Sequence, residues 1–308
     1  MTTIDAIRSG ISGTRRAAWM VFIFYGCNLL LAAAVAAPMY RTLADHIGHS
    51  AVGNELARGF SSSWLVEFQI AKADFLNSFS IAIAYAGILF LALNTVLSAG
   101  AFEVYRHGAG ASMHAFGRGI GKYFGRFARI AVVASLFYFV AFWLWQGPAA
   151  ALLNWIFRDS VPERWHFYLN WLRWALLFAS VFVVNAVAEY AKAGVVIDEH
   201  PSALAAIGHG AGFVVAHFWR VMAIYCTLGA LTTLTILVYA AFARYFPQSS
   251  VATVLIWFLV AQVLLWLRWM FRLSSWGAAV AYSSAHRPRR DTAEPSPAEA
   301  PAPQAMSR

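Results

Sequence analysis

Six apolar stretches of about 20 residues dominate the chain and limit what it can fold into. They lie at residues 17–37, 76–101, 130–150, 171–193, 221–242 and 251–273. A helix rises about 1.5 Å per residue, so each stretch is long enough to cross roughly 30 Å of hydrocarbon. A membrane β-barrel would show alternating segments of about ten residues instead. We therefore expect an all-α, polytopic membrane bundle of six transmembrane helices.

The low fraction of charged residues supports a membrane location, and their distribution predicts the orientation of the protein in the membrane. Only 12% of the residues are charged, whereas soluble domains carry about 25%. The net charge of +9 does not call for a nucleic-acid partner, because cytoplasmic termini would place sixteen of the 23 Lys and Arg residues on the cytoplasmic side. The first stretch resembles a signal peptide, but its 21 uncharged residues exceed the usual 7 to 15 or so. We expect a retained helix and a multi-pass protein of the bacterial inner membrane, with both termini cytoplasmic.

An internal repeat groups the six helices in pairs. Shifting the sequence by 91 positions superposes seven residues without gaps, among them Asn94 on Asn185 and Gly119 on Gly210. A shift of 200 positions superposes Gly10 on Gly210 in a weaker match. We expect three units, each an amphipathic cytoplasmic helix followed by a transmembrane hairpin. They lie near residues 3–105, 111–197 and 202–283 of a six-helix domain that spans residues 1–284.

The amphipathic segment of the second unit predicts contact with the membrane surface. Its basic face consists of Arg118, Lys122, Arg126 and Arg129. Basic residues near an anionic headgroup contribute about 1 kcal/mol each, so we expect anionic lipids as partners here. The alternative is that the segment only links helices beneath the bundle. The glycines at 117, 119 and 121 do not fit a phosphate loop. We expect them to permit close approach of another backbone.

Polar residues inside the apolar stretches form a candidate intramembrane site. Its members lie on the second, fourth and sixth stretches: Asn94, Asn185, Glu189, Lys192, Arg268 and Arg272. Intramembrane charges usually face the bundle interior, so we expect Glu189 to pair with Lys192, Arg268 or Arg272. The set is either a substrate or ion site between units, or interhelical hydrogen bonding with basic side chains that reach the interface.

Two segments are expected outside the bundle. Residues 40–75 form a periplasmic insert with a short helical cap, and residues 285–308 form a disordered cytoplasmic tail. Asp45, His46 and His49 lie close together in the insert, but no fourth ligand is evident, so we expect no metal. No cofactor is expected either.

Short motifs give the chain two resemblances. Ile47-Gly48-His49-Ser50, residues 64–68 and Glu189-Tyr190-Ala191-Lys192 continuing to Ala206 resemble an uncharacterised family of bacterial six-helix inner-membrane proteins. The repeated unit is similar, more loosely, to the membrane domain attached to some glycerophosphodiester phosphodiesterases. Neither resemblance implies catalytic residues for this chain.

Function is constrained mainly by what the sequence lacks. No HExxH or GxSxG motif is present, so we expect no catalytic residues and a non-enzymatic role. The preferred hypothesis is interaction with lipids or with a membrane partner, which includes another membrane protein or a second copy of the chain. The alternative is a transporter or channel with a pathway lined by Asn94, Asn185, Glu189 and Lys192. A membrane enzyme is the third option.

Overall fold

A computed structural model of the chain describes residues 1–48, 61–108, 112–156, 163–198, 202–245 and 250–286. In these residues the regular elements are helices, and six are long and apolar enough to cross a membrane. The protein is therefore an all-α, multi-pass membrane protein. The helices are α1 (Thr3–Arg16), α2 (Ala18–Ile47), α4 (Ser62–Ala71), α5 (Ala73–His107), α6 (Met113–Gln146), α7 (Pro148–Ile156), α8 (Glu163–Asp198), α9 (Ala203–Ala216), α10 (Phe218–Tyr245) and α11 (Val251–His286).

The long helices contain four of the predicted apolar stretches entirely and extend beyond most of their ends. The first stretch begins one residue before α2, and the third runs past the end of α6 into α7. Helix α11 continues to His286, two residues past the predicted end of the bundle, and the predicted tail from residue 287 onward lies outside the described residues. The predicted insert is shorter than expected at both ends, because α2 continues to Ile47 and α5 begins at Ala73. Helix α4 occupies its second half, while residues 49–60 lie outside the described part.

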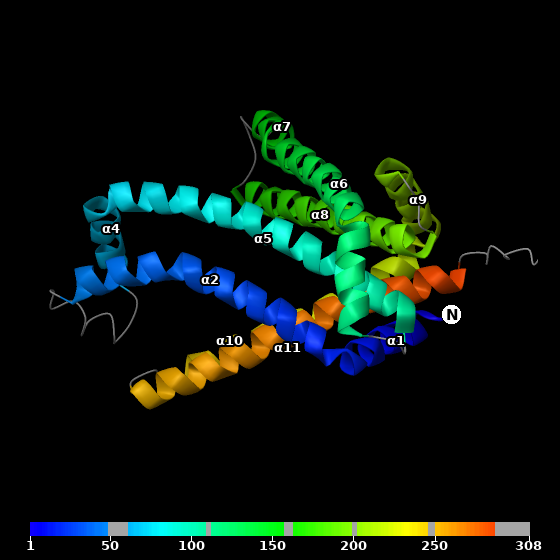
Figure 1. Cartoon of the computed structure of the whole chain (residues 1–308). Coiled ribbons are helices and arrows are strands. Elements are labelled where there is room, and N and C mark those ends of the chain that lie inside the picture. Colours follow the sequence, from blue (N-terminus) through cyan, green and yellow to red (C-terminus); the bar gives the residue numbers. More distant parts are fainter. Residues whose placement is uncertain (49–60, 109–111, 157–162, 199–201, 246–249, 287–308) are drawn as a thin grey trace, which may run out of the picture.

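Three hairpins meet at one end of the molecule and diverge toward the other. They are formed by α2 and α5, by α6, α7 and α8, and by α10 and α11 (Figure 1). Buried aromatic rings hold the shared end together: the ring centres of Phe24 and Phe102 lie 5.5 and 5.6 Å from that of Trp276. Phe102 also packs edge-to-face on Phe127 of α6. The core thus lies where the hairpins converge.

Three helical segments, which we call the seam helices, lie at this convergent end: α1, the first part of α6 (residues 113–129) and α9 (Figure 1). Each begins at a hydroxyl N-cap, with Thr2, Ser112 and Ser202 accepting a backbone hydrogen bond at 3.2, 3.1 and 3.4 Å. Hydrogen bonds from Thr2 also lower the pKa of Asp5 in the first cap. Single non-helical residues, Ala17 and His217, separate α1 and α9 from the membrane helices that follow.

One glycine in each seam helix allows it to pack directly on a membrane helix. A Cβ on Gly10 would lie 2.7 Å from the Ala278 nitrogen of α11, and one on Gly119 would lie 2.9 Å from the Ala99 oxygen of α5. On Gly210 it would lie 2.7 Å from the backbone nitrogen of residue 191 in α8. The second and third seam helices thus each contact the last helix of the preceding hairpin, and α1 contacts α11, the last helix in the described part of the chain. The contacts close into a ring.

The other glycines of the second seam helix have a different setting. A Cβ on Gly117 or Gly121 would meet nothing within 4 Å, whereas Gly119 touches α5. The expected close approach of another backbone therefore holds for Gly119 and is wrong for Gly117 and Gly121. The reason is geometric, because residues two apart on a helix point to different faces and a single neighbouring helix meets only one of them.

Candidate intramembrane site

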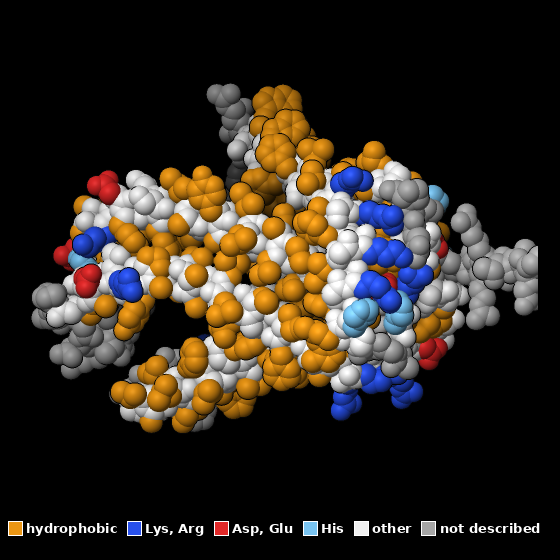
Figure 2. All heavy atoms as spheres, in the orientation of Figure 1, with side chains coloured by type: hydrophobic (Ala, Val, Ile, Leu, Met, Phe, Trp, Pro, Cys, Tyr) orange, Lys and Arg blue, Asp and Glu red, His pale blue; other side chains and the backbone are white. Residues whose placement is uncertain are grey.

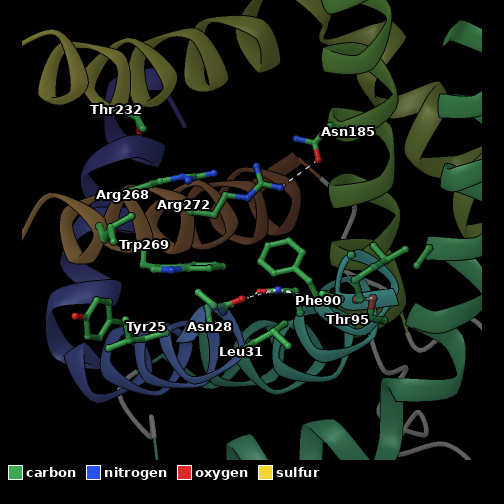
Figure 3. Close-up of a pocket in the computed structure, with 18 of the residues that line it drawn as sticks. Tyr25, Asn28, Leu31, Phe90, Thr95, Asn185, Thr232, Arg268, Trp269 and Arg272 are labelled. Atoms are coloured by element: carbon green, nitrogen blue, oxygen red, sulfur yellow. Dashed lines mark hydrogen bonds between the residues drawn. The ribbon is translucent and has the colours of Figure 1, made fainter. Parts of the chain in front are cut away.

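A cavity of about 1350 Å³ lies between the three hairpins. Residues of α2, α5, α6, α8, α10 and α11 line it, and Figure 3 shows ten of them labelled. All six polar residues predicted for an intramembrane site lie in this lining: Asn94, Asn185, Glu189, Lys192, Arg268 and Arg272. The structure brings them to one cavity but divides them into separate sets of contacts.

Glu189 is the centre of the largest set. Its carboxylate is 2% exposed, and one oxygen lies 2.6 Å from a nitrogen of Arg272. Arg272 also donates to Asn185 at 3.1 Å, Asn185 donates to Glu189 at 3.3 Å, and Tyr225 donates to the second carboxylate oxygen. Of the three predicted partners of Glu189, the structure pairs it with Arg272. These bonds join α8, α10 and α11 at the cavity wall.

Two further cations line the cavity without a carboxylate partner. In the described part of the chain, no Asp or Glu oxygen lies within 4 Å of Lys192 or Arg268. The Lys192 ammonium lies 5.6 Å from the ring centre of Phe127. Figure 3 shows Arg268 extending beside Arg272 in the same direction across the pocket. The lining therefore holds three cations and one carboxylate.

Asn94 belongs to a different contact, between α5 and α2. Its amide and that of Asn28 donate to each other at 3.1 and 3.4 Å, which ties α5 to α2 (Figure 3). Nearby, the Tyr25 hydroxyl donates to Gln262 at 2.7 Å and ties α2 to α11. Asn28, Tyr25 and Gln262 were not among the residues predicted for the site. Asn28 and Gln262 could have been predicted from the sequence, because a side-chain amide inside an apolar stretch needs a hydrogen-bond partner.

A second polar cluster lies where α5 meets the second seam helix. Glu103, only 2% exposed, accepts from Arg118 at 3.4 Å and lies 3.8 Å from an Arg106 nitrogen. Arg118 also contacts His107 at 2.9 Å, and these four residues with Lys122 line a cavity of about 460 Å³. The predicted headgroup contact Arg118 is thus partly engaged by a buried carboxylate that sequence analysis did not single out.

All four predicted headgroup residues lie along the first part of α6. Arg118, Lys122 and Arg129 are exposed, and Figure 2 shows basic side chains gathered at this end of the molecule. Arg126 is half-buried, with its guanidinium 6.0 Å from the ring centre of Tyr123. The helix therefore presents three exposed cations on one surface.

Only two of the three insert residues considered for metal binding lie in the described part of the chain. Asp45 and His46 lie on α2, where the His46 ring packs against Phe68 with ring centres 5.2 Å apart. His49 lies outside the described residues. Among the described residues, no group of three or more His, Cys, Asp or Glu side chains is placed to hold a metal ion.

Comparison with known proteins adds no relative from which function can be transferred. No protein-family model, curated protein or solved structure matches the chain. The two resemblances based on short motifs remain predictions, and the function must be argued from the geometry of the cavity.

Proposed function

We propose that this chain is a non-enzymatic protein of the bacterial inner membrane that binds a lipid-like molecule between its three hairpins. The observation that supports this function is the cavity of about 1350 Å³. Pockets for drug-sized ligands are usually about 300 to 1000 Å³. A larger, largely apolar cavity in a membrane protein suits a molecule with a long hydrocarbon chain.

The length of the cavity fits such a chain. On α2 its lining runs from Tyr25 to Leu43, eighteen residues apart, which corresponds to about 27 Å along a helix. This is close to the roughly 30 Å of a bilayer's hydrocarbon core. On α5 the lining runs from Phe79 to Thr95. An acyl chain can lie along these apolar walls while a polar group lies near the charged residues of α8 and α11.

Filling the cavity is expected to displace the bound lipid. Gly87 and Gly229 line the cavity and have no neighbour within 4 Å of an added Cβ, so the double variant Gly87→Trp, Gly229→Trp introduces two large rings there. We expect purified wild-type protein to retain lipid after detergent exchange, and the double variant to lose most of it. Native mass spectrometry measures the lipid that remains bound.

The matched control is Gly26→Trp, because Gly26 also lies in a membrane helix with open space around it but does not line the cavity. It should retain lipid at the wild-type level. Wild-type protein without bound lipid, or a double variant with wild-type lipid content, would contradict the proposal.

Transport is a second candidate, because all four residues predicted for a pathway line the same cavity. Cysteine at position 94 tests it in a variant whose Cys27 is replaced by alanine. A pathway predicts labelling of Asn94→Cys by a charged maleimide from both sides of the membrane, and a binding cavity predicts labelling from one side at most. Native Cys226 is exposed but outside the lining, so it serves as a control facing the lipid.

The proposed orientation places the convergent end in the cytoplasm. Its support is the positive-inside rule together with the exposed Arg118, Lys122 and Arg129 at that end, which would contact anionic lipid headgroups. We also propose that the chain consists of three repeated units. The support is that Gly10, Gly119 and Gly210, which the sequence shifts superpose, occupy corresponding contacts in the ring of seam helices.

A further inference from the structure

We propose that the molecule held in the cavity carries an oxyanion headgroup, and that Lys192 and Arg268 bind it. This inference rests on the proposed lipid-binding function and adds the chemical class of the ligand and the residues that select it. The shared chemistry is a phosphate or carboxylate group attached to a hydrocarbon chain.

The charged residues of the cavity lining favour an anionic ligand. Of its three cations, Arg272 is paired with Glu189 at 2.6 Å. That pairing leaves Lys192 and Arg268 with no carboxylate within 4 Å in the described part of the chain. Charged side chains are costly in a membrane and mark candidate sites for an ion or a ligand. Two spare cations in one cavity favour an anionic occupant over a neutral or zwitterionic one.

Glu189 already has three hydrogen-bond donors of its own. Its carboxylate accepts from Arg272, Asn185 and Tyr225. A carboxylate offers about four acceptor sites, so these donors occupy most of its capacity. Lys192 and Arg268 therefore remain available to a ligand, while Arg272 keeps the wall of the cavity in place.

The chemistry and direction of the Lys192 and Arg268 side chains suit an oxyanion. A guanidinium presents a planar set of donors that matches phosphate or carboxylate oxygens, and an ammonium adds a compact positive charge. Arg268 reaches into the pocket from α11 beside Arg272 (Figure 3), and Lys192 lines it from α8. The headgroup would thus be held between the second and third hairpins, with its chain along the apolar walls of α2 and α5.

The experiment offers purified protein an equimolar mixture of phosphatidylglycerol and phosphatidylcholine with identical acyl chains and measures both in the bound fraction by mass spectrometry. We expect wild-type protein to enrich phosphatidylglycerol about tenfold, as a charge-assisted contact allows. In Lys192→Gln, Arg268→Gln the enrichment should disappear while the total bound lipid stays close to wild type.

Two further variants show whether a loss of enrichment results from the removed cavity charges, from misfolding or from charges at the protein surface. Lys192→Arg, Arg268→Lys keeps both charges and should retain the enrichment. Arg220→Gln removes one exposed charge outside the cavity and should also retain it. Loss of enrichment in Arg220→Gln would assign the selectivity to the protein surface and overturn the inference.

The outcomes distinguish this inference from the proposed function. Lipid that is bound and displaced by the tryptophan pair, but without preference for phosphatidylglycerol, overturns the inference and leaves the proposed function standing. Enrichment that persists in Lys192→Gln, Arg268→Gln overturns the assignment of these two residues. Wild-type protein that holds no lipid overturns both.

Discussion

Replacement of Arg272 by methionine is expected to lower the free energy of unfolding by about 3 kcal/mol. The change leaves the Glu189 carboxylate, 2% exposed, without its cationic partner, and removing one member of a buried ion pair costs about 3 to 5 kcal/mol. We expect the lower end, because Tyr225 and Asn185 still donate to the carboxylate. Equilibrium unfolding of the purified protein in mixed detergent micelles measures the change.

The double variant Glu189→Gln, Arg272→Met gives the sharpest control. Removing the carboxylate's charge as well should recover part of the loss, since no buried charge then remains unpaired. Arg220→Met removes an exposed arginine outside the cavity and should change stability by no more than about 0.5 kcal/mol. An Arg272→Met variant as stable as Arg220→Met would show that the pair does not hold α8 to α11.

Alanine at the seam glycines is expected to have the second large effect. At Gly10, Gly119 or Gly210 the new methyl group would press on the backbone of a neighbouring helix, which cannot move aside as a flexible side chain can. Overpacking of this kind costs about 1 to 3 kcal/mol. We expect each variant to lose about 2 kcal/mol, and leucine at the same positions to prevent accumulation of folded protein. Unfolding in detergent and the yield of monodisperse protein measure these effects.

The chain offers matched glycines for comparison. Gly117 and Gly121 flank Gly119, and Gly208 and Gly212 flank Gly210, all with nothing within 4 Å of an added Cβ. Alanine there should stabilise by up to about 1 kcal/mol, because glycine is a poor helix former. If the flanking and seam positions respond alike, helix propensity rather than close packing controls this end of the molecule.

Much of the fold could be predicted because hydrophobic length is a local property of the sequence. Apart from residue 17, all six stretches fall inside the observed membrane spans. The ends were harder to predict, as α11 shows by continuing from Leu273 to His286. Its last turns contain small and polar residues such as Ser274 and Ala278, which are fully buried because α1 covers them. A hydropathy pattern cannot show that residues are buried by a helix more than 250 residues away in the sequence.

The sequence named six polar residues that all line one cavity, but it left three possible partners for Glu189. Each of the six polar residues lines the cavity, since polar groups at membrane depth turn toward the interior. Which arginine meets Glu189 depends on how α11 is rotated against α8, and Arg268 and Arg272 lie on the same face by spacing alone. Glu103 was overlooked because it follows an apolar stretch, where a carboxylate normally reaches solvent instead of being buried beneath Arg118.

The contact between α1 and α11 has a consequence for how the protein is made. The ribosome produces α1 before α11, so the backbone surface around Gly10 meets its partner only after the other described helices have been made. The other two seam helices each meet a partner that precedes them directly in the chain. Biogenesis should therefore pass through an open chain of hairpins, with the membrane surface sheltering the apolar face of α1, before a final docking step completes the cavity.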